Sequence, residues 1–373
     1  MKKIDNLTGV RAFAALWVVI FHFQSSDGIS GLNLGSLIQH GYLGVDIFFV
    51  LSGLILSLLY CEQLPGTFSF SWLREFIIKR IAKLYPLHLV TFLVMVLVVL
   101  GARYAGSAYR HEGDNTAWSA IANLFLIHAW GVTSSLSWNA PSWSISAEWF
   151  AYCLVFPIMV YGLRQKRLFV VIGLCAVLWG AYVFGALHWS SRGLSVTTAG
   201  VARIVPEFLI GYAVYRSLGK TKDASGDLLS LIGIALLVSA CLIDGGYLVL
   251  AAPAIAITLV GLYVGGPISD VIFGNRLAIF VGKISYSIYM LQLFVQMAAN
   301  QMVRHLQIQY TPRNALMLLF GELGVAILAG CAAYYLLEEP LRLRLLDLVK
   351  RGDRARADIG LKTSNRPQEI STL

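Results

Sequence analysis

The chain has 373 residues, of which 57% are hydrophobic and only 13% are charged, whereas about 25% of the residues in a soluble domain are charged. This composition excludes an ordinary soluble domain and predicts an all-α, polytopic membrane protein. The net charge of +9 is a topology signal and does not indicate nucleic-acid binding. Five isolated cysteines lack paired spacing, which argues against a zinc site, a disulfide framework or a redox motif.

Apolar runs of spanning length occur ten times along the chain. We expect membrane helices near residues 8–24, 41–60, 83–104, 142–162, 168–187, 200–217, 228–244, 247–264, 277–298 and 315–337. A further piece, 118–130, is too short to cross and is expected to be re-entrant or interfacial. With this arrangement and the N-terminus inside, 22 of the 29 lysines and arginines are cytoplasmic, as the positive-inside rule requires.

The first apolar run carries two ionisable side chains, Arg11 and His22. Eleven residues turn a helix through about three full rotations, so both side chains leave on one face, ~16 Å apart along the axis. A charge at the centre of a membrane helix costs ~2.5 to 3.5 kcal/mol. Both groups are therefore candidates for a functional role.

The second run begins with Asp46 and continues with Ser52-Gly53. Asp46 enters the membrane near the depth at which His22 leaves it, so its carboxylate either orients the imidazole or caps its own helix. The small Ser52-Gly53 pair permits close helix packing or the close approach of a ligand.

Basic residues precede the third run, on a cytoplasmic helical stretch expected to end at Pro86. Arg80 and Lys83 are helix neighbours there. They either grip a phosphate at the membrane face or act only as topology anchors.

The fourth run starts with Trp143 and Ser144, and Glu148 follows one helical turn later. Ser144 and Glu148 share a face because they are four residues apart. A carboxylate at that depth needs a partner, for which Arg11, Arg203 and His22 are available. Arg203 and Glu207 are also four residues apart and are expected to neutralise each other.

Near the C-terminus, Ser285, Tyr286, Tyr289 and Gln292 lie along one predicted helix, where Tyr289 and Gln292 can reach each other or a ligand. Glu322 is an intramembrane acid with no obvious partner. Pro340 is expected to halt the last helix. We predict one membrane domain over residues 1–346 and a disordered cytoplasmic tail over 347–373.

In order along the chain, these motifs resemble those of the membrane-bound acyltransferase family 3. They are the Arg11-to-His22 pattern, Gly44 to Gly53 with Asp46, Arg80 to Pro86, Ser142-Trp143-Ser144 with Glu148, and Glu339-Pro340. Two departures are Lys83, which keeps the charge but loses bidentate geometry, and Gln292, where the family commonly has histidine. With Gln292 unable to act as a base, the resemblance assigns that role to His22.

The resemblance implies an O-acyltransferase that moves an acyl group, usually acetyl, from cytoplasmic acetyl-CoA to a glycan or lipid-linked sugar hydroxyl in the bacterial inner membrane. It implies no metal and leaves the oligomeric state open. The residues implied are catalytic His22, Asp46 and Glu148, acyl-CoA-binding Arg11, Arg80, Lys83, Ser52 and Tyr286, and acceptor-binding Trp143, Ser144 and Arg203. Intramembrane acids and bases are also found in proton relays, so the alternative is a proton-coupled transporter or exporter of a glycan precursor.

Overall fold

The computed structural model describes residues 2–349 and 351, except 27, 31, 33, 107–111, 190–195 and 219–224. All regular secondary structure in these residues is helical. Eight of the described helical segments are long and apolar enough to cross a membrane. The predicted all-α, multi-pass membrane fold is confirmed.

Each predicted span coincides with a helical segment. These segments are α1 (Lys2–Phe23), α3 (Gly44–Tyr60), α4 (Phe70–Tyr104), α6 (Trp143–Phe150) with η6 (Ala151–Val155) and α7 (Phe156–Leu163), α8 (Leu168–Trp189), α9 (Val196–Ser217), α10 (Gly226–Leu242), α11 (Gly246–Val264), α13 (Arg276–His305), and α14 (Pro312–Ala333) with η9 (Tyr334–Glu338). The eight candidate spans leave out α9 and the shorter α10.

Shorter helical pieces connect these segments: α2 (Gly35–Gln39), η1 (Gly41–Leu43), η2 (Cys61–Gln63), η3 (Glu112–Asp114), α5 (Ala117–Leu124), η4 (His128–Val132), η5 (Ala140–Ser142) and α12 (Pro267–Ile272). The apolar piece 118–130 forms α5 and the start of η4. Since α5 has only eight residues, this piece is too short to cross, as predicted.

Both predicted helix ends at proline are wrong. α4 runs through Pro86 as one helix of 35 residues, about 52 Å long, because a membrane helix tolerates proline where neighbours and local adjustments satisfy the freed carbonyl. The last helix also passes Pro340 and continues to Val349. There the Glu339 N–H bonds to the Tyr334 carbonyl five residues back, and this wider π turn makes room for the proline ring. Residues 352–373 of the predicted tail lie outside the described residues.

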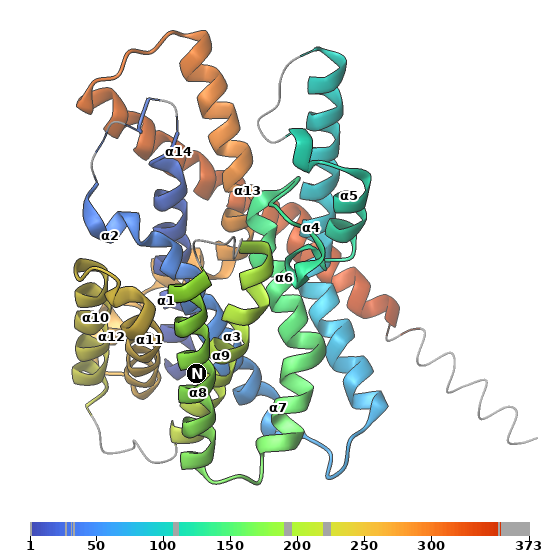
Figure 1. The fold of residues 1–373 in the computed structure, drawn as a ribbon, viewed down its shortest axis with the longest axis vertical. Coiled ribbons are helices and arrows are strands. Elements are labelled where there is room, and N and C mark those ends of the chain that lie inside the picture. Colours follow the sequence, from blue (N-terminus) through green and yellow to red (C-terminus); the bar gives the residue numbers. More distant parts are fainter. Residues whose placement is uncertain are drawn as a thin grey trace, which may run out of the picture.

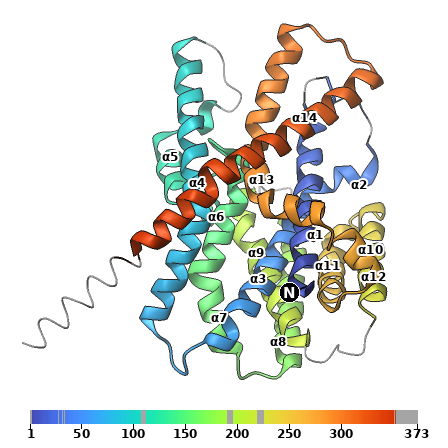
Figure 2. The same cartoon turned by 180° about the vertical axis from the view of Figure 1, so that it is seen from behind.

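The helices are arranged around α1, α3 and α9 (Figure 1). α4 runs along one side of the molecule, and the hairpin of α10 and α11 lies on the opposite side. α1 packs against α13 and α3, and α3 packs against α9. In Figure 2, the view from behind, α14 and its continuation cross obliquely in front of α4. Segments of α1, α3, α4, α6 and α13 therefore meet at the centre of the bundle.

Two glycines allow α3 and α9 to touch backbone to backbone. A Cβ added at Gly53 would overlap the carbonyl oxygen of Phe208, and one added at Gly211 would overlap that of Val50. Small residues permit such close approach in membrane bundles. Gly53 therefore serves packing, whereas its neighbour Ser52 lines a cavity.

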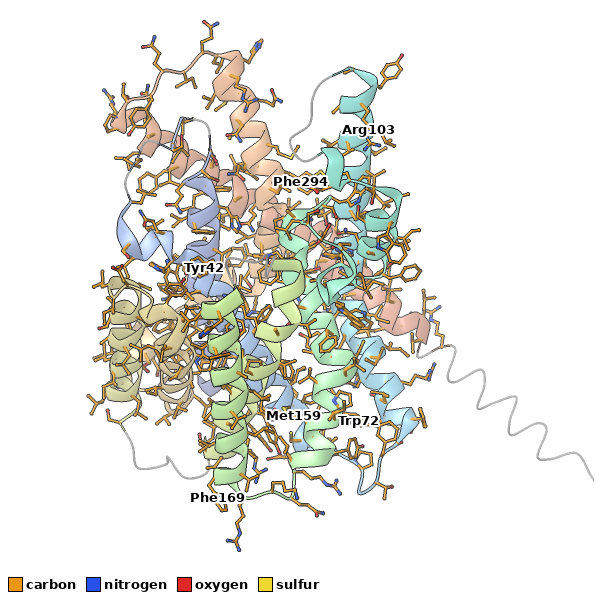
Figure 3. All side chains as sticks on the ribbon, in the orientation of Figure 1. Tyr42, Trp72, Arg103, Met159, Phe169 and Phe294 are labelled. Atoms are coloured by element: carbon orange, nitrogen blue, oxygen red, sulfur yellow. The ribbon has the colours of Figure 1, made fainter. Side chains whose placement is uncertain are left out.

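An aromatic cluster surrounds Trp72 on the α4 side of the bundle (Figure 3). The Trp72 ring stacks on Phe76 at 5.5 Å between centroids, and Phe76 lies 5.0 Å from Phe156. Tyr60 meets Phe76 edge to face at 5.1 Å. Offset and edge-to-face aromatic pairs stabilise such packing, so this cluster fixes the turn of α4 that precedes Arg80.

Candidate active site

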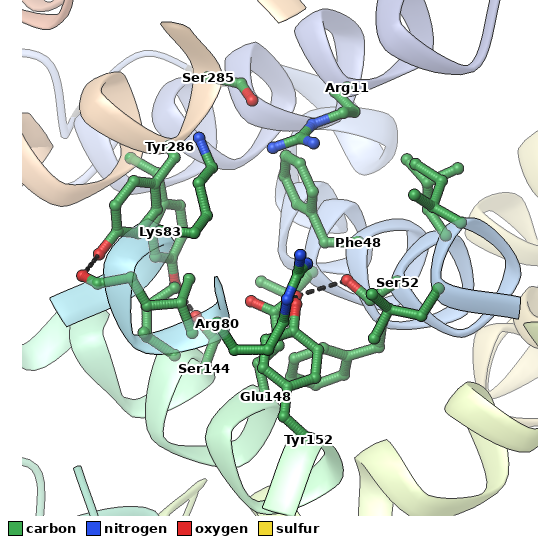
Figure 4. A pocket seen from close by; sticks show the side chains of 18 residues that line it. Arg11, Phe48, Ser52, Arg80, Lys83, Ser144, Glu148, Tyr152, Ser285 and Tyr286 are labelled. Atoms are coloured by element: carbon green, nitrogen blue, oxygen red, sulfur yellow. Dashed lines mark hydrogen bonds between the residues drawn. The ribbon is translucent and has the colours of Figure 1, made fainter. Parts of the chain in front are cut away.

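A central cavity of about 120 Å³ lies where α1, α3, α4, α6 and α13 meet, and polar side chains surround it (Figure 4). The polar lining consists of Arg11, Ser52, Arg80, Lys83, Ser144, Glu148, Tyr152, Ser285, Tyr286 and Tyr289. The structure thus brings together seven predicted site residues: Arg11, Ser52, Arg80, Lys83, Ser144, Glu148 and Tyr286. His22, Asp46, Trp143 and Arg203 are outside this lining.

Two guanidinium groups enter the cavity from different helices, Arg11 from α1 and Arg80 from α4. Arg11 lies 5.9 Å from the ring centroid of Phe48, and Arg80 donates to the Tyr60 hydroxyl at 3.3 Å. Within the described residues, neither guanidinium forms an ion pair with a carboxylate, and the Nε of each has no hydrogen-bond partner. Since buried charge is costly without a counter-charge, the cavity is suited to bind an anion.

Lys83 differs from these arginines because it already has a counter-ion. Its ammonium is ion-paired with Glu338, whose other oxygen accepts a hydrogen bond from Ser287. Glu338 is 1% exposed, so the pair is held between α4, α13 and η9. The predicted phosphate contact of Lys83 would therefore have to compete with Glu338.

A second chamber of about 530 Å³ adjoins the central cavity on the side where α1 begins. Arg11, Arg80 and Lys83 line both spaces, which places them at the junction. The second chamber, which we call the basic vestibule, is also lined by Lys79, Lys283 and Arg342. Lys79 pairs with Glu75 at 2.6 Å and Arg342 with Glu339 at 2.7 Å. Basic residues thus outnumber acidic ones around the entrance to the cavity.

Glu148 is the one carboxylate among the residues that line the central cavity. Its Oε1 accepts hydrogen bonds from the hydroxyls of Ser52 and Tyr152. Ser144 shares the face of Glu148 as predicted, but its hydroxyl donates to Tyr289 at 2.9 Å and to the Pro141 carbonyl at 3.3 Å. The carboxylate of Glu148 is therefore held by α3 and η6, and Arg11, Arg203 and His22 are not its hydrogen-bond partners.

Asp46 contacts Arg203 instead of His22. The Arg203 Nε donates to Asp46 at 2.6 Å, and a second guanidinium nitrogen bonds to the other oxygen of the carboxylate. Glu207 also pairs with Arg203, as expected. Its contact of 3.6 Å is longer than the contact between Asp46 and Arg203. The ring centroid of Trp143 is 6.0 Å from the guanidinium. The expectation that Asp46 orients His22 is wrong in this geometry, because bidentate pairing with Arg203 occupies both carboxylate oxygens.

His22 lies beyond the central cavity, toward the other end of α1. Its Nδ1 donates to the Val18 carbonyl at 2.8 Å, so the neutral imidazole leaves Nε2 without a proton. Gln296 of α13 donates to the His22 carbonyl at 2.8 Å. Between His22 and the cavity, Tyr289 donates to the Pro141 carbonyl at 2.9 Å. The sequence thus placed Arg11 and His22 correctly on one helix, but only Arg11 reaches the cavity.

Sequence reasoning missed the side chains that hold the site together. Tyr152, Ser287 and Glu338 position Glu148 or Lys83. No sequence spacing links Lys83 with Glu338, 255 residues away. One available signal was that Glu338 is an acid at the end of an apolar run, where an unpaired carboxylate would be costly.

A family model described as an acyltransferase domain matches residues 4–336. The chain belongs to the acyltransferase 3 family. It is 32% identical over 171 residues to acyltransferase MdmB of Streptomyces mycarofaciens, covering 44% of this chain and 41% of that relative. It is 29% identical over 195 residues to the peptidoglycan O-acetyltransferase OatA of Listeria monocytogenes, covering 48% and 29%. The matches thus span less than half the length of both curated relatives, and no solved structure matches.

The motifs of this family that the sequence contains do not form a single cluster. Arg80, Ser144 and Glu148 meet at the central cavity with Arg11. Asp46 belongs to the Arg203 ion pair, and His22 lies next to α13. The geometry therefore separates a half with two guanidinium groups from a half that contains the imidazole.

Proposed function

We propose that the protein is an integral membrane O-acyltransferase that moves an acyl group, most simply acetyl, from acyl-CoA to a hydroxyl of a cell-envelope glycan. The observation that carries the proposal is the central cavity, which contains the guanidinium groups of Arg11 and Arg80 without ion-pair partners among the described residues and adjoins the basic vestibule. Acyl-CoA combines the anionic phosphates and the long, slender arm that such a site would accept.

The donor is proposed to enter from the basic vestibule. Its phosphates would contact Arg80, Arg11 and the surrounding lysines, because arginine binds phosphate through paired, charge-assisted hydrogen bonds. The pantetheine arm would extend into the central cavity, where the fixed carboxylate of Glu148 can accept a hydrogen bond from its amide groups. The basic loops predict that this side is cytoplasmic, where acyl-CoA is made.

The acceptor is proposed to approach from the side of His22. The unprotonated Nε2 can take the proton of a hydroxyl as that oxygen attacks the thioester carbon. A carbon–oxygen bond forms, the carbon–sulfur bond breaks, and the proton ends on the sulfur of CoA. A glycan acceptor is supported by the name of the relative OatA, a peptidoglycan O-acetyltransferase. Tyr289 and Ser144 lie between the two halves, so transfer requires this contact to open.

The test is release of free CoA thiol from acetyl-CoA by membranes that contain the protein, supplied with a crude glycan extract of the host envelope. The wild type is expected to release thiol, and His22→Gln, which keeps the size and loses the base, is expected to release at least about 100-fold less. Normal release by His22→Gln would refute the role of His22. No release by the wild type would favour the transporter alternative.

A further inference from the structure

α13 carries a continuous polar stripe on the side that meets α1. Ser285, Tyr289, Gln292 and Gln296 recur at intervals of four, three and four residues, which places them on one helical face. Ser285 and Tyr289 line the central cavity, whereas Gln296 donates to the His22 carbonyl at 2.8 Å and to Ser25 at 3.1 Å. Gln292 therefore lies between the cavity and the loop that follows His22.

Gln292 is the unsatisfied member of this stripe. Its side chain is 1% exposed, yet neither its amide oxygen nor its amide nitrogen has a hydrogen-bond partner in the described part of the chain. Buried amides in folded proteins are almost always bonded, because leaving one unpaired destabilises the fold. An amide in this state has hydrogen-bonding capacity left for a polar ligand.

The imidazole of His22 lies within hydrogen-bonding reach of the Gln292 side chain. Because the Nδ1 of His22 donates to Val18, its Nε2 accepts. The amide of Gln292 offers one donor group and one acceptor. A hydroxyl that contacts both groups can donate its proton to Nε2 and accept a hydrogen bond from the amide nitrogen.

A second orphaned amide oxygen belongs to Asn139, the residue before η5. Asn139 is fully buried, and its nitrogen reaches the carbonyl of Met290 at 3.5 Å, while its oxygen has no partner among the described residues. Met290 stands between Tyr289 and Gln292 on α13. Two unsatisfied amides, one on α13 and one in contact with it, fit a ligand with several hydroxyl groups, as a sugar has.

We propose that Gln292 binds the acceptor at its reacting hydroxyl and orients that hydroxyl toward His22, an inference that rests on the proposed function. As the hydroxyl oxygen attacks the acyl carbon, its proton passes to the Nε2 of His22 and then to the sulfur that leaves with CoA. Gln292 neither gains nor loses a proton. It is a positioning residue that contacts the acceptor, and the ligand class is a polyhydroxyl compound such as a sugar.

The experiment uses Gln292→Met in the full chain, because methionine keeps the length and removes both polar atoms. The thermal unfolding midpoint is expected to stay equal or rise, since an unsatisfied amide is removed. The half-saturating acetyl-CoA concentration is expected to stay unchanged. At low concentrations of host glycan extract, the thiol-release rate per unit of extract is expected to fall about 10- to 100-fold in Gln292→Met. Gln292→His retains a hydrogen-bond donor and is expected to recover part of this rate.

Asn123→Leu is the matched control for a buried amide with a structural role. Asn123 is also fully buried, but its nitrogen donates to Ser119 at 2.8 Å and to Ser137 at 3.1 Å. Asn123→Leu is expected to lower the thermal unfolding midpoint, whereas Gln292→Met is expected to leave it equal or raise it.

Three outcomes would overturn the inference. If Gln292→Met lowers the unfolding midpoint as Asn123→Leu does, the amide is structural. If it keeps the wild-type dependence on glycan extract, the amide does not contact the acceptor, and the acyltransferase proposal stands without it. If the wild type releases no thiol with acetyl-CoA and extract, the proposed function fails and the role of Gln292 fails with it.

Discussion

Arg80 is positioned for an anion by contacts that do not neutralise its charge. Its guanidinium lies within 5.8 Å of the ring centroids of Tyr60, Phe76 and Tyr152 and donates to the Tyr60 hydroxyl. Aromatic faces stabilise a cation without cancelling it. The charge thus remains available to a ligand that enters from the basic vestibule.

Replacing this guanidinium tests the donor site. Arg80→Gln should raise the half-saturating acetyl-CoA concentration about 10- to 100-fold, because a charge-assisted hydrogen bond to phosphate is lost. Thiol release over a range of acetyl-CoA concentrations measures this. Arg164→Gln is the control, because Arg164 donates to the carbonyls of Pro65 and Gly66 away from the cavity. Equal shifts in both variants would remove Arg80 from the donor site.

The buried pair of Lys83 and Glu338 makes a prediction about stability. Glu338→Gln leaves the Lys83 charge without its partner and should lower the free energy of unfolding by about 3 kcal/mol. Glu339→Gln, one residue along, breaks a partly exposed pair with Arg342 and should cost about 0.5 kcal/mol. Denaturant unfolding in mixed micelles compares the two, and a similar cost for both would contradict a structural role for Glu338.

Ionisable side chains at membrane depth could be identified from the sequence, but the ion pairs that they form could not be predicted. Arg11 and Glu148 could be placed near the site because charge inside an apolar run is costly and needs a reason. Arg80 was expected at the cytoplasmic membrane face, as a phosphate contact or a topology anchor. The partners of Asp46 and Lys83 could not be predicted. They depend on how α9 and η9 pack against α3 and α4, and no local spacing encodes that packing.

The contact between α3 and α9 is the element-scale feature most sensitive to a single methyl group. Gly53→Ala would push a Cβ into the Phe208 carbonyl, and the free energy of unfolding should fall by about 2 kcal/mol. Gly173→Ala on α8 is the control, because a Cβ there meets no atom within 4 Å and alanine favours a helix by about 0.5 to 1 kcal/mol. If the two variants unfold alike, the helices can separate to admit the methyl group.

Helix positions followed from apolar run length, but helix ends did not. The ten runs were recognisable because a spanning helix needs about 20 apolar residues. Pro86 and Pro340 were read as helix ends, although in a bundle the neighbouring helices and a π turn accommodate them. Local sequence rules fail there because the compensation comes from tertiary packing.

Across the whole molecule, Tyr289 and Ser144, which contact each other, line the central cavity, whereas the imidazole of His22 lies outside it. The basic vestibule opens on the side where α1 begins. This arrangement fits a donor and an acceptor that arrive from different faces of the membrane. The family resemblance led us to expect these candidate residues, whereas their separation into two groups could not be predicted from the sequence.

The most direct test is the sidedness of the donor. Acetyl-CoA does not cross membranes, so inside-out and right-side-out vesicles expose only one face of the protein to it. With host glycan extract present on both sides, we predict acetyl-CoA-dependent thiol release from inside-out vesicles, which present the basic vestibule, and none from intact right-side-out vesicles. Release from right-side-out vesicles alone, or equal release from both, would contradict a donor site that opens through the basic vestibule to the cytoplasm.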